Sequence, residues 1–195
     1  MSHRARHRQS APPTIVPLVE PGAELTDSQH ERYARHISLK DIGEIGQRRL
    51  LNARVLMIGA GGLGSTTLTY LAAAGVGTIG IVDADRVDLS NLQRQIIHST
   101  AAIGELKVDS AARRLRELNP DLDVVTYPLR ITEGNVDEIL RGWDLVIDGT
   151  DNLPTRYLIS DAAVRLAMPE VFGSVLEWGA QISVFWTGES AVAAG

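Results

Sequence analysis

The stretch between residues 54 and 83 constrains the fold more than any other, because a glycine-rich turn lies between two apolar runs. A β-prone run, residues 55–58, precedes the turn, and a helix-like run follows it to Ala74. A second apolar run, residues 79–82, ends on Asp83. This order predicts a strand, a turn, a helix and a second strand with an acidic tip, which is how a phosphate-binding turn of the dinucleotide type is built.

The glycines of this turn have a recognisable spacing. Gly59, Gly61 and Gly64 match G-x-G-x-x-G, which lets the backbone turn sharply and approach a phosphate closely. The helix that follows directs free N–H groups and its positive dipole end at the anion. Asp83 adds two oxygens that can accept from ribose hydroxyls. The pattern predicts a nucleotide without saying which one, and a glycine turn without a ligand stays open as the alternative.

Composition excludes several classes of protein. The 195 residues suit one domain, with 44% hydrophobic and 22% charged residues. A net charge of −5 does not indicate a nucleic-acid partner. No apolar run is long enough to cross a membrane, and nothing near the N-terminus resembles a secretory signal. The absence of cysteine excludes disulfides, thiolate zinc sites and a cysteine nucleophile within the chain. We therefore expect a cytoplasmic protein with no membrane partner and no zinc site in this chain.

Short apolar runs alternate with helix-like segments along the rest of the chain. The runs at residues 123–127 and 144–148 predict two more strands, and such alternation is typical of a parallel sheet. Two last runs, residues 171–175 and 181–185, are joined by too few residues for a crossover helix. We therefore expect an α/β fold. Its Rossmann-like, doubly wound sheet should be mostly parallel, mixed at this hairpin, and covered by helices on both faces.

Helices are predicted from caps and periodicity. Thr26 and Gln29 have the spacing of a capping box, so a helix should follow and carry residues 31–36. Further helices are expected over residues 44–51, from about Glu105 to Asn119, over residues 136–140, and from about Pro154 to Leu166.

A polar string follows the second strand at the edge where ligands lie in open α/β sheets. In this string, Asn91 and Gln93 can both donate and accept hydrogen bonds. Arg94 can bind a phosphate through two parallel hydrogen bonds. The alternative is an ordinary loop capped by Asn91.

Two further charged residues stand out. Lys107 lies in the first turn of a predicted helix, where a cation opposes the helix dipole at a cost of a few tenths of a kcal/mol. Contact with a bound phosphate would explain that placement, and chance placement on a solvated face is the alternative. Asp151 follows the fourth strand and could hold Mg²⁺ through oxygen. Alternatively, Asp148 and Asp151 both cap the next helix.

Six segments, taken in order, resemble one family. Together they closely resemble the MoeB/ThiF (HesA) adenylyltransferases, including the molybdopterin-synthase adenylyltransferases, which are relatives of the ubiquitin-activating enzymes. The segments are Arg32-Tyr33-Ala34-Arg35-His36, Gly59–Gly64, Asp83-Ala84-Asp85, Ser90-Asn91-Leu92-Gln93-Arg94-Gln95, Gly104-Glu105-Leu106-Lys107 and Gly149-Thr150-Asp151-Asn152.

The resemblance implies an activity. Such enzymes bind ATP and Mg²⁺ together with a ubiquitin-fold sulfur-carrier protein that ends in Gly-Gly. The terminal carboxylate of the carrier attacks the α-phosphate, which gives an acyl-adenylate and releases pyrophosphate. The carrier, and the pathway among molybdopterin, thiamine, cysteine and tRNA thiolation, stay open.

The resemblance also implies residue roles. Catalysis would fall to Arg94, Lys107, Asp151 and Arg35, with Asp151 holding Mg²⁺ and Arg35 reaching the phosphates of the neighbouring subunit in a homodimer. The nucleotide would be bound by Gly59, Gly61, Gly62, Gly64, Asp83, Ser90, Asn91, Leu92, Gln93, Arg94, Lys107, Asp151 and Asn152.

The chain also departs from the family pattern. It lacks the paired CxxC motifs and the later cysteine that many relatives carry. We expect a disordered tail over residues 1–24, a ThiF-type nucleotide-binding domain over residues 25–187 that is incomplete at its C-terminal end, and a frayed tail over residues 188–195. Two alternatives to the adenylating enzyme remain, namely an NAD-dependent oxidoreductase and a truncated, inactive nucleotide-binding module.

Overall fold

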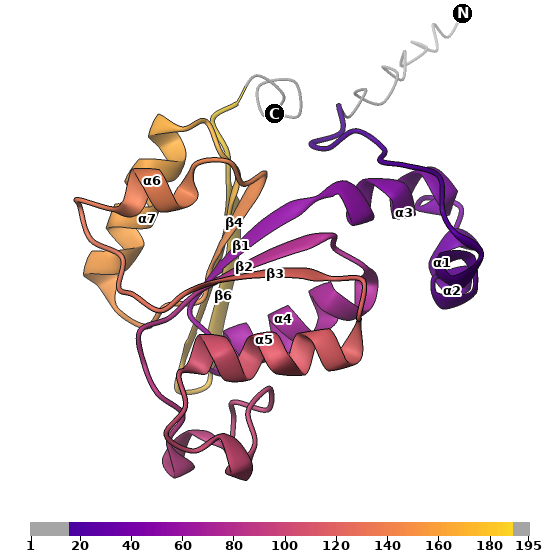
Figure 1. The fold of residues 1–195 in the computed structure, drawn as a ribbon. Coiled ribbons are helices and arrows are strands. Elements are labelled where there is room, and N and C mark those ends of the chain that lie inside the picture. The colour runs from indigo at the N-terminus through magenta and orange to yellow at the C-terminus, as the bar shows by residue number, and fades with distance from the viewer. Residues whose placement is uncertain (1–15, 189–195) are drawn as a thin grey trace, which may run out of the picture.

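A computed structural model describes residues 16–188, which form a six-stranded sheet in the order β3-β2-β1-β4-β5-β6 (Figure 1). Strands β1 to β5 run parallel to one another, and β6 is antiparallel to β5. The predicted mixed sheet with a terminal hairpin is therefore confirmed. The strands are β1 (Arg54–Ile58), β2 (Thr78–Val82), β3 (Asp123–Tyr127), β4 (Leu145–Asp148), β5 (Glu170–Leu176) and β6 (Gly179–Phe185).

Helices cover both faces of the sheet. Figure 1 shows α4 and α5 on one face and α6 and α7 on the other, while α1 to α3 lie beyond one end of the strands. Two short 3₁₀ helices, Leu89–Asn91 and Thr100–Ala102, lie in the long connection between β2 and α5. The α-helices are α1 (Asp27–Arg32), α2 (Ala34–Ile37), α3 (Gly43–Asn52), α4 (Gly62–Ala74), α5 (Lys107–Leu118), α6 (Val136–Leu140) and α7 (Leu153–Arg165).

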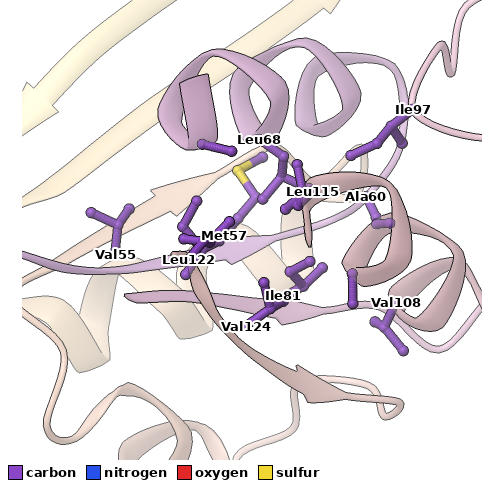
Figure 2. Close-up of a cluster of buried hydrophobic side chains, with 14 of the residues drawn as sticks. Val55, Met57, Ala60, Leu68, Ile81, Ile97, Val108, Leu115, Leu122 and Val124 are labelled. Atoms are coloured by element: carbon purple, nitrogen blue, oxygen red, sulfur yellow. The ribbon is translucent and has the colours of Figure 1, made fainter. Parts of the chain in front are cut away.

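Both faces of the central strands are buried, which explains their continuous apolar runs. Val55 and Met57 of β1 point to one side and pack with Leu68 of α4 and Leu115 of α5 (Figure 2). Alternate residues point to the other side, where Leu56 belongs to the cluster formed with α6 and α7. The two clusters hold the sheet rigid between its helical layers, so the loops at the strand ends have a fixed frame.

One predicted helix is divided in two. The capping box of Thr26 and Gln29 is present, but the expected helix over residues 31–36 breaks at Tyr33, between α1 and α2. Tyr33 is 2% exposed, and its hydroxyl accepts a hydrogen bond from Asn119 Nδ2 at 3.0 Å. Its ring also packs against Gly75, where a Cβ would lie 2.6 Å from the ring. The chain turns at Tyr33 because the ring is buried there.

The first three helices lie at the amino-terminal edge of the parallel strands. Arg32 Nη1 donates to the carbonyl of Leu118 at the end of α5, and Gln47 Nε2 donates to the carbonyl of Ala74 at the end of α4. The adjoining part of the predicted tail is also held, since Arg48 of α3 donates to the carbonyl of Gly22 at 2.7 Å. The rest of that tail and nearly all of the predicted frayed end lie outside the described residues. Within residues 16–188, no helix is both long and apolar enough to span a membrane.

Candidate functional site

A backbone cradle lies at the carboxyl edge of the sheet, where β1 passes into α4. Gly59 has φ +95°, a conformation that favours glycine. A Cβ on Gly64 would lie 1.9 Å from the carbonyl oxygen of Gly59, so only glycine fits there. The first N–H groups of α4, which begins at Gly62, have no acceptor within the helix. They are therefore available to an anion.

The cradle lies at the point where the strand order reverses. From β1 the chain proceeds outward to β2 and β3, and then returns to β4 on the other side of β1. Gly149, just after β4, donates to the carbonyl of Ile58, and a Cβ on Gly59 would lie 3.1 Å from the carbonyl oxygen of Gly149. The glycine turn and the loop of residues 149–152 are therefore neighbours, in the crevice where ligands of open α/β sheets bind.

Asp83 braces the glycine turn from the end of β2. Its Oδ2 accepts from the Ala60 N–H at 2.8 Å, and its Oδ1 accepts from the Asp85 N–H at 2.8 Å. A carboxylate has about four acceptor positions, so both oxygens keep capacity for ribose hydroxyls. Asp83 can therefore hold the glycine turn in place and still bind a ribose as predicted. The first of these functions was not predicted from the sequence.

Lys107 does not lie on a solvated face. It is the first residue of α5 and only 6% exposed, and its Nζ lies 3.3 Å from Asp85 Oδ2. Arg130 also reaches Asp85, with 3.3 Å between Nη2 and Oδ1. The pairing of Lys107 with Asp85 compensates for the unfavourable position of a cation at a helix N-terminus. The solvated-face alternative is therefore wrong.

Arg94 lies over the start of α4. A Cβ on Gly62 would lie 3.6 Å from Cγ and Cδ of Arg94, so the side chain is in contact distance of the cradle. The guanidinium is exposed and makes one long hydrogen bond, from Nη1 to the carbonyl of Ser90 at 3.5 Å. An exposed guanidinium with few contacts is free to bind an anion at this place.

The rest of the polar string forms its own local structure. The Ser90 hydroxyl donates to Asp88 Oδ1 at 2.6 Å, and this hydrogen bond lowers the pKa of Asp88. Asn91 Nδ2 lies 3.4 Å from Ser90 Oγ, and Gln93 is exposed. Asn91 does not cap a helix by its side chain, because Asp88 caps the short 3₁₀ helix. Leu92 is half-buried in the same turn.

The loop after β4 is built around a buried carboxylate. Asp148 is fully buried, and burial is the main reason that its pKa is raised. Its Oδ1 accepts from the N–H and the hydroxyl of Thr150 at 2.8 and 2.7 Å. The cap of α7 is Asn152, whose side chain accepts from the Thr155 N–H, so the alternative that Asp148 and Asp151 cap this helix is wrong. Asp151 is exposed on the same loop.

Sequence reasoning missed two residues that hold this site together. Arg156 donates to the carbonyl of Thr150 and, through Nη1, to Ser174 Oγ at 3.1 Å, so it fastens the loop to β5. His98 is buried between the glycine turn and α5. Neither residue stands out by type in the sequence, because each acts through partners far away in the chain.

Arg35 lies apart from these residues. It is exposed on α2, at the amino-terminal edge of the sheet, whereas the glycine turn is at the carboxyl edge. Five residues of strand separate the two edges by about 17 Å. The structure therefore does not bring Arg35 to the glycine turn of its own chain.

Known proteins resemble this chain in sequence and in fold. The sequence matches the ThiF family over residues 33–194. The chain belongs to the ThiF family. It is 52% identical over 173 residues to a probable adenylyltransferase/sulfurtransferase MoeZ of Mycobacterium tuberculosis, a match that covers 89% of this chain and 44% of that protein. A sulfur carrier protein adenylyltransferase of Thermus thermophilus is 49% identical over 160 residues, covering 82% of this chain and 59% of that protein.

Solved structures of ThiF-type proteins share the fold. The tRNA N6-threonylcarbamoyladenosine dehydratase TcdA of Escherichia coli, solved in complex with ATP, superposes with a TM-score of 0.73 at 27% identity. The match covers 80% of this chain and 65% of TcdA. This ThiF-family chain therefore spans less than two thirds of the length of these relatives.

Proposed function

We propose that this ThiF-family protein is an ATP-dependent adenylyltransferase that activates the C-terminal Gly-Gly carboxylate of a ubiquitin-like sulfur-carrier protein. The observations that carry the proposal are the placement of Arg94 against Gly62, at the cradle of N–H groups, and the pairing of buried Lys107 with Asp85. The names of the mycobacterial and Thermus relatives support the reaction class.

The proposed reaction builds up negative charge around the α-phosphorus, which cationic side chains would stabilise. A carboxylate oxygen of the carrier forms a bond to the α-phosphorus of ATP, and the bond from that phosphorus to the bridging oxygen breaks. The electron pair leaves with pyrophosphate. Arg94 and Lys107 would stabilise the added negative charge, and the N–H groups at the start of α4 would orient the phosphates. Asp83 would hold the ribose through its remaining acceptor positions.

The chain suits Mg²⁺ brought by the nucleotide. In proteins, Mg²⁺ is usually held by one or two carboxylates together with substrate phosphates and water. Asp151 is an exposed carboxylate on the loop beside the glycine turn. Within residues 16–188, no three His, Asp or Glu side chains come together as a metal site. Asp151 would supply the one protein ligand to Mg²⁺, and the metal would neutralise charge on the phosphates.

The place of Arg35 favours a homodimer in which it acts on the partner subunit. It cannot serve the site of its own chain from the opposite edge of the sheet, and its side chain is exposed. Contacts in a two-fold dimer are reciprocal, so a dimer that brings one α2 to the glycine turn of the partner brings the partner's α2 to the first glycine turn. Arg35 would then add a third cation to each set of phosphates.

Binding and exchange measurements test the proposal. Calorimetry should show that ATP with Mg²⁺ binds and that NAD does not, because Arg94 and Lys107 suit a triphosphate. ATP–pyrophosphate exchange should then depend on a carrier that ends in Gly-Gly. Preferential binding of NAD would favour an oxidoreductase. Binding of ATP without exchange, in the chain or in a longer form of the protein, would favour an inactive nucleotide-binding module.

A further inference from the structure

His98 is a buried residue to which none of the roles above has been given. It follows the polar string of residues 90–95 and is 7% exposed. Both of its ring nitrogens are hydrogen-bonded within the protein, so neither is left for a nucleotide. We propose that His98 is a positioning residue, which sets the direction of the Gly61 N–H in the phosphate cradle and couples this turn to the helix that begins with Lys107. The inference rests on the proposed function.

The hydrogen bonds of His98 define its tautomer. Its Nε2 lies 3.2 Å from the carbonyl oxygen of Ala60, which can only accept, so Nε2 carries the proton. Its Nδ1 lies 3.0 Å from Ser110 Oγ, and in the neutral ring this nitrogen accepts from the hydroxyl. Burial is the main reason that the pKa of His98 is lowered, which favours the neutral ring at pH 7.

Charged groups act on the imidazole. Beyond the effect of burial, the positive charge of Lys107 lowers the pKa of His98 and the negative charge of Asp83 raises it. A groove of about 320 Å³ is lined in part by His98 together with Arg113, Arg114 and Glu117. The imidazole therefore lies between the Ala60 carbonyl and Ser110 of α5 and borders this groove.

The two peptide units that flank Ala60 are each held by a side chain. The Ala60 N–H donates to Asp83 Oδ2, and the Ala60 carbonyl accepts from His98. The carbonyl of Ala60 and the N–H of Gly61 belong to one peptide unit, and in a trans peptide they point in opposite directions. By holding the carbonyl toward the protein interior, His98 turns the Gly61 N–H away from the interior. The Gly61 N–H directly precedes those of α4, so rotation of this peptide would remove a donor beside the cradle.

The same side chain connects the turn with Lys107. Ser110 is three residues after Lys107 on α5, so the two residues lie on neighbouring turns of one helix face. The hydrogen bond from Ser110 to His98 therefore fixes the distance between the start of α5 and the glycine turn. The imidazole of His98 would therefore position two phosphate donors relative to each other, namely the Gly61 N–H and the Lys107 ammonium.

Three substitutions test this role by calorimetry with ATP and Mg²⁺ and by urea unfolding. His98→Phe keeps the ring volume without hydrogen bonds and should weaken ATP binding about tenfold, as expected for one lost hydrogen bond. His98→Gln can donate to Ala60 and should bind ATP almost as the parent does. Ile139→Val, in the buried α6 on the other face of the sheet, is a control that lowers stability and should leave ATP binding unchanged.

The outcomes separate the inference from the proposed function. If the parent binds ATP and a folded His98→Phe binds it equally well, or if His98→Gln is no better than His98→Phe, the positioning role is refuted. If His98→Phe does not fold, Ser110→Ala must weaken ATP binding, since it removes the link to α5 alone. Nitrogen-15 NMR of the parent must show the tautomer protonated at Nε2, and the other tautomer overturns the role whether or not ATP binds. A parent that binds no ATP refutes the proposed function.

Discussion

The ammonium of Lys107 lies 3.3 Å from Asp85, and the two residues join the first turn of α5 to the tip of β2. Asp85 is half exposed, with 54% of its side chain accessible, whereas 8% of the Lys107 side chain is accessible. The pair therefore has a buried cation and a carboxylate open to solvent. A bound triphosphate would meet an ammonium that is already oriented.

Lys107→Ala should lower ATP–pyrophosphate exchange about a hundredfold, the usual effect of removing one charge-stabilising donor. The variant should still fold, with a lower free energy of unfolding, because the buried aliphatic stem of Lys107 is lost while Asp85 is already open to solvent. Exchange with a Gly-Gly carrier and urea unfolding measure the two effects. Arg114→Ala on the same helix is the control for removing a cation, since Arg114 is exposed and its ion pair within residues 16–188 is with Glu117. Exchange that survives Lys107→Ala would contradict its role.

Arg94→Ala should reduce the same exchange by about a hundredfold, because its guanidinium lies over the start of α4 and would face the developing charge. Its exposed side chain contributes little to folding, so the melting temperature should stay close to that of the parent. Arg113→Ala, which removes another exposed arginine, serves as the control. A large loss of stability in Arg94→Ala would mean that this residue is structural.

Arg35→Ala and Lys107→Ala should each be nearly inactive alone and regain activity when mixed. In an equal mixture with subunit exchange, about half of the two-fold dimers are mixed, and each of these has one complete site. About a quarter of all sites should then work. Native mass spectrometry verifies that mixed dimers form. If they form and no exchange activity returns, Arg35 does not act across the dimer.

Glu170→Gln should stabilise the protein near pH 7. Glu170 is 1% exposed, and one of its oxygens has no hydrogen-bond partner among the described residues. Burial chiefly raises the pKa of Glu170 above its usual 4.5, and the nearby Asp148 raises it further. The folded state therefore disfavours the ionised form. This penalty is absent below the usual pKa and grows as pH rises toward the folded pKa.

The expected gain is about 1–2 kcal/mol in the free energy of unfolding at pH 7, the scale of the desolvation penalty of a buried polar group, because the amide carries no charge. Near pH 4 the gain should be small, because Glu170 is then mostly protonated in both states. Urea unfolding at the two pH values measures the difference. Glu177→Gln changes an exposed carboxylate and should have no effect at either pH. Equal effects of Glu170→Gln at both pH values would mean that ionisation is not the cause.

Sequence patterns predicted the sheet well, because its signals are local. The run at residues 123–127 has the length of β3, and the short link before Gly179 required the antiparallel hairpin. The break at Tyr33 could not be predicted, since it depends on Gly75 and Asn119, which are distant in the sequence. Local propensity over residues 31–36 favoured one helix, and tertiary packing overrode it.

The site was only partly predictable for a related reason. The glycine spacing and Asp83 have a local signature, so the cradle could be located. Asn152 rather than Asp148 caps α7 because Asp148 is buried at the end of β4, and residue type alone does not show burial. His98 acts through Ala60, 38 residues away, so its partners became visible only in the folded chain.

Arg35 and the glycine turn lie at opposite ends of the parallel strands. This separation affects how the reaction rate depends on the concentration of the protein. Under the proposed arrangement a lone subunit carries an incomplete centre, so turnover per molecule should fall on dilution. In a cell holding little of this enzyme, doubling its synthesis would more than double the flux.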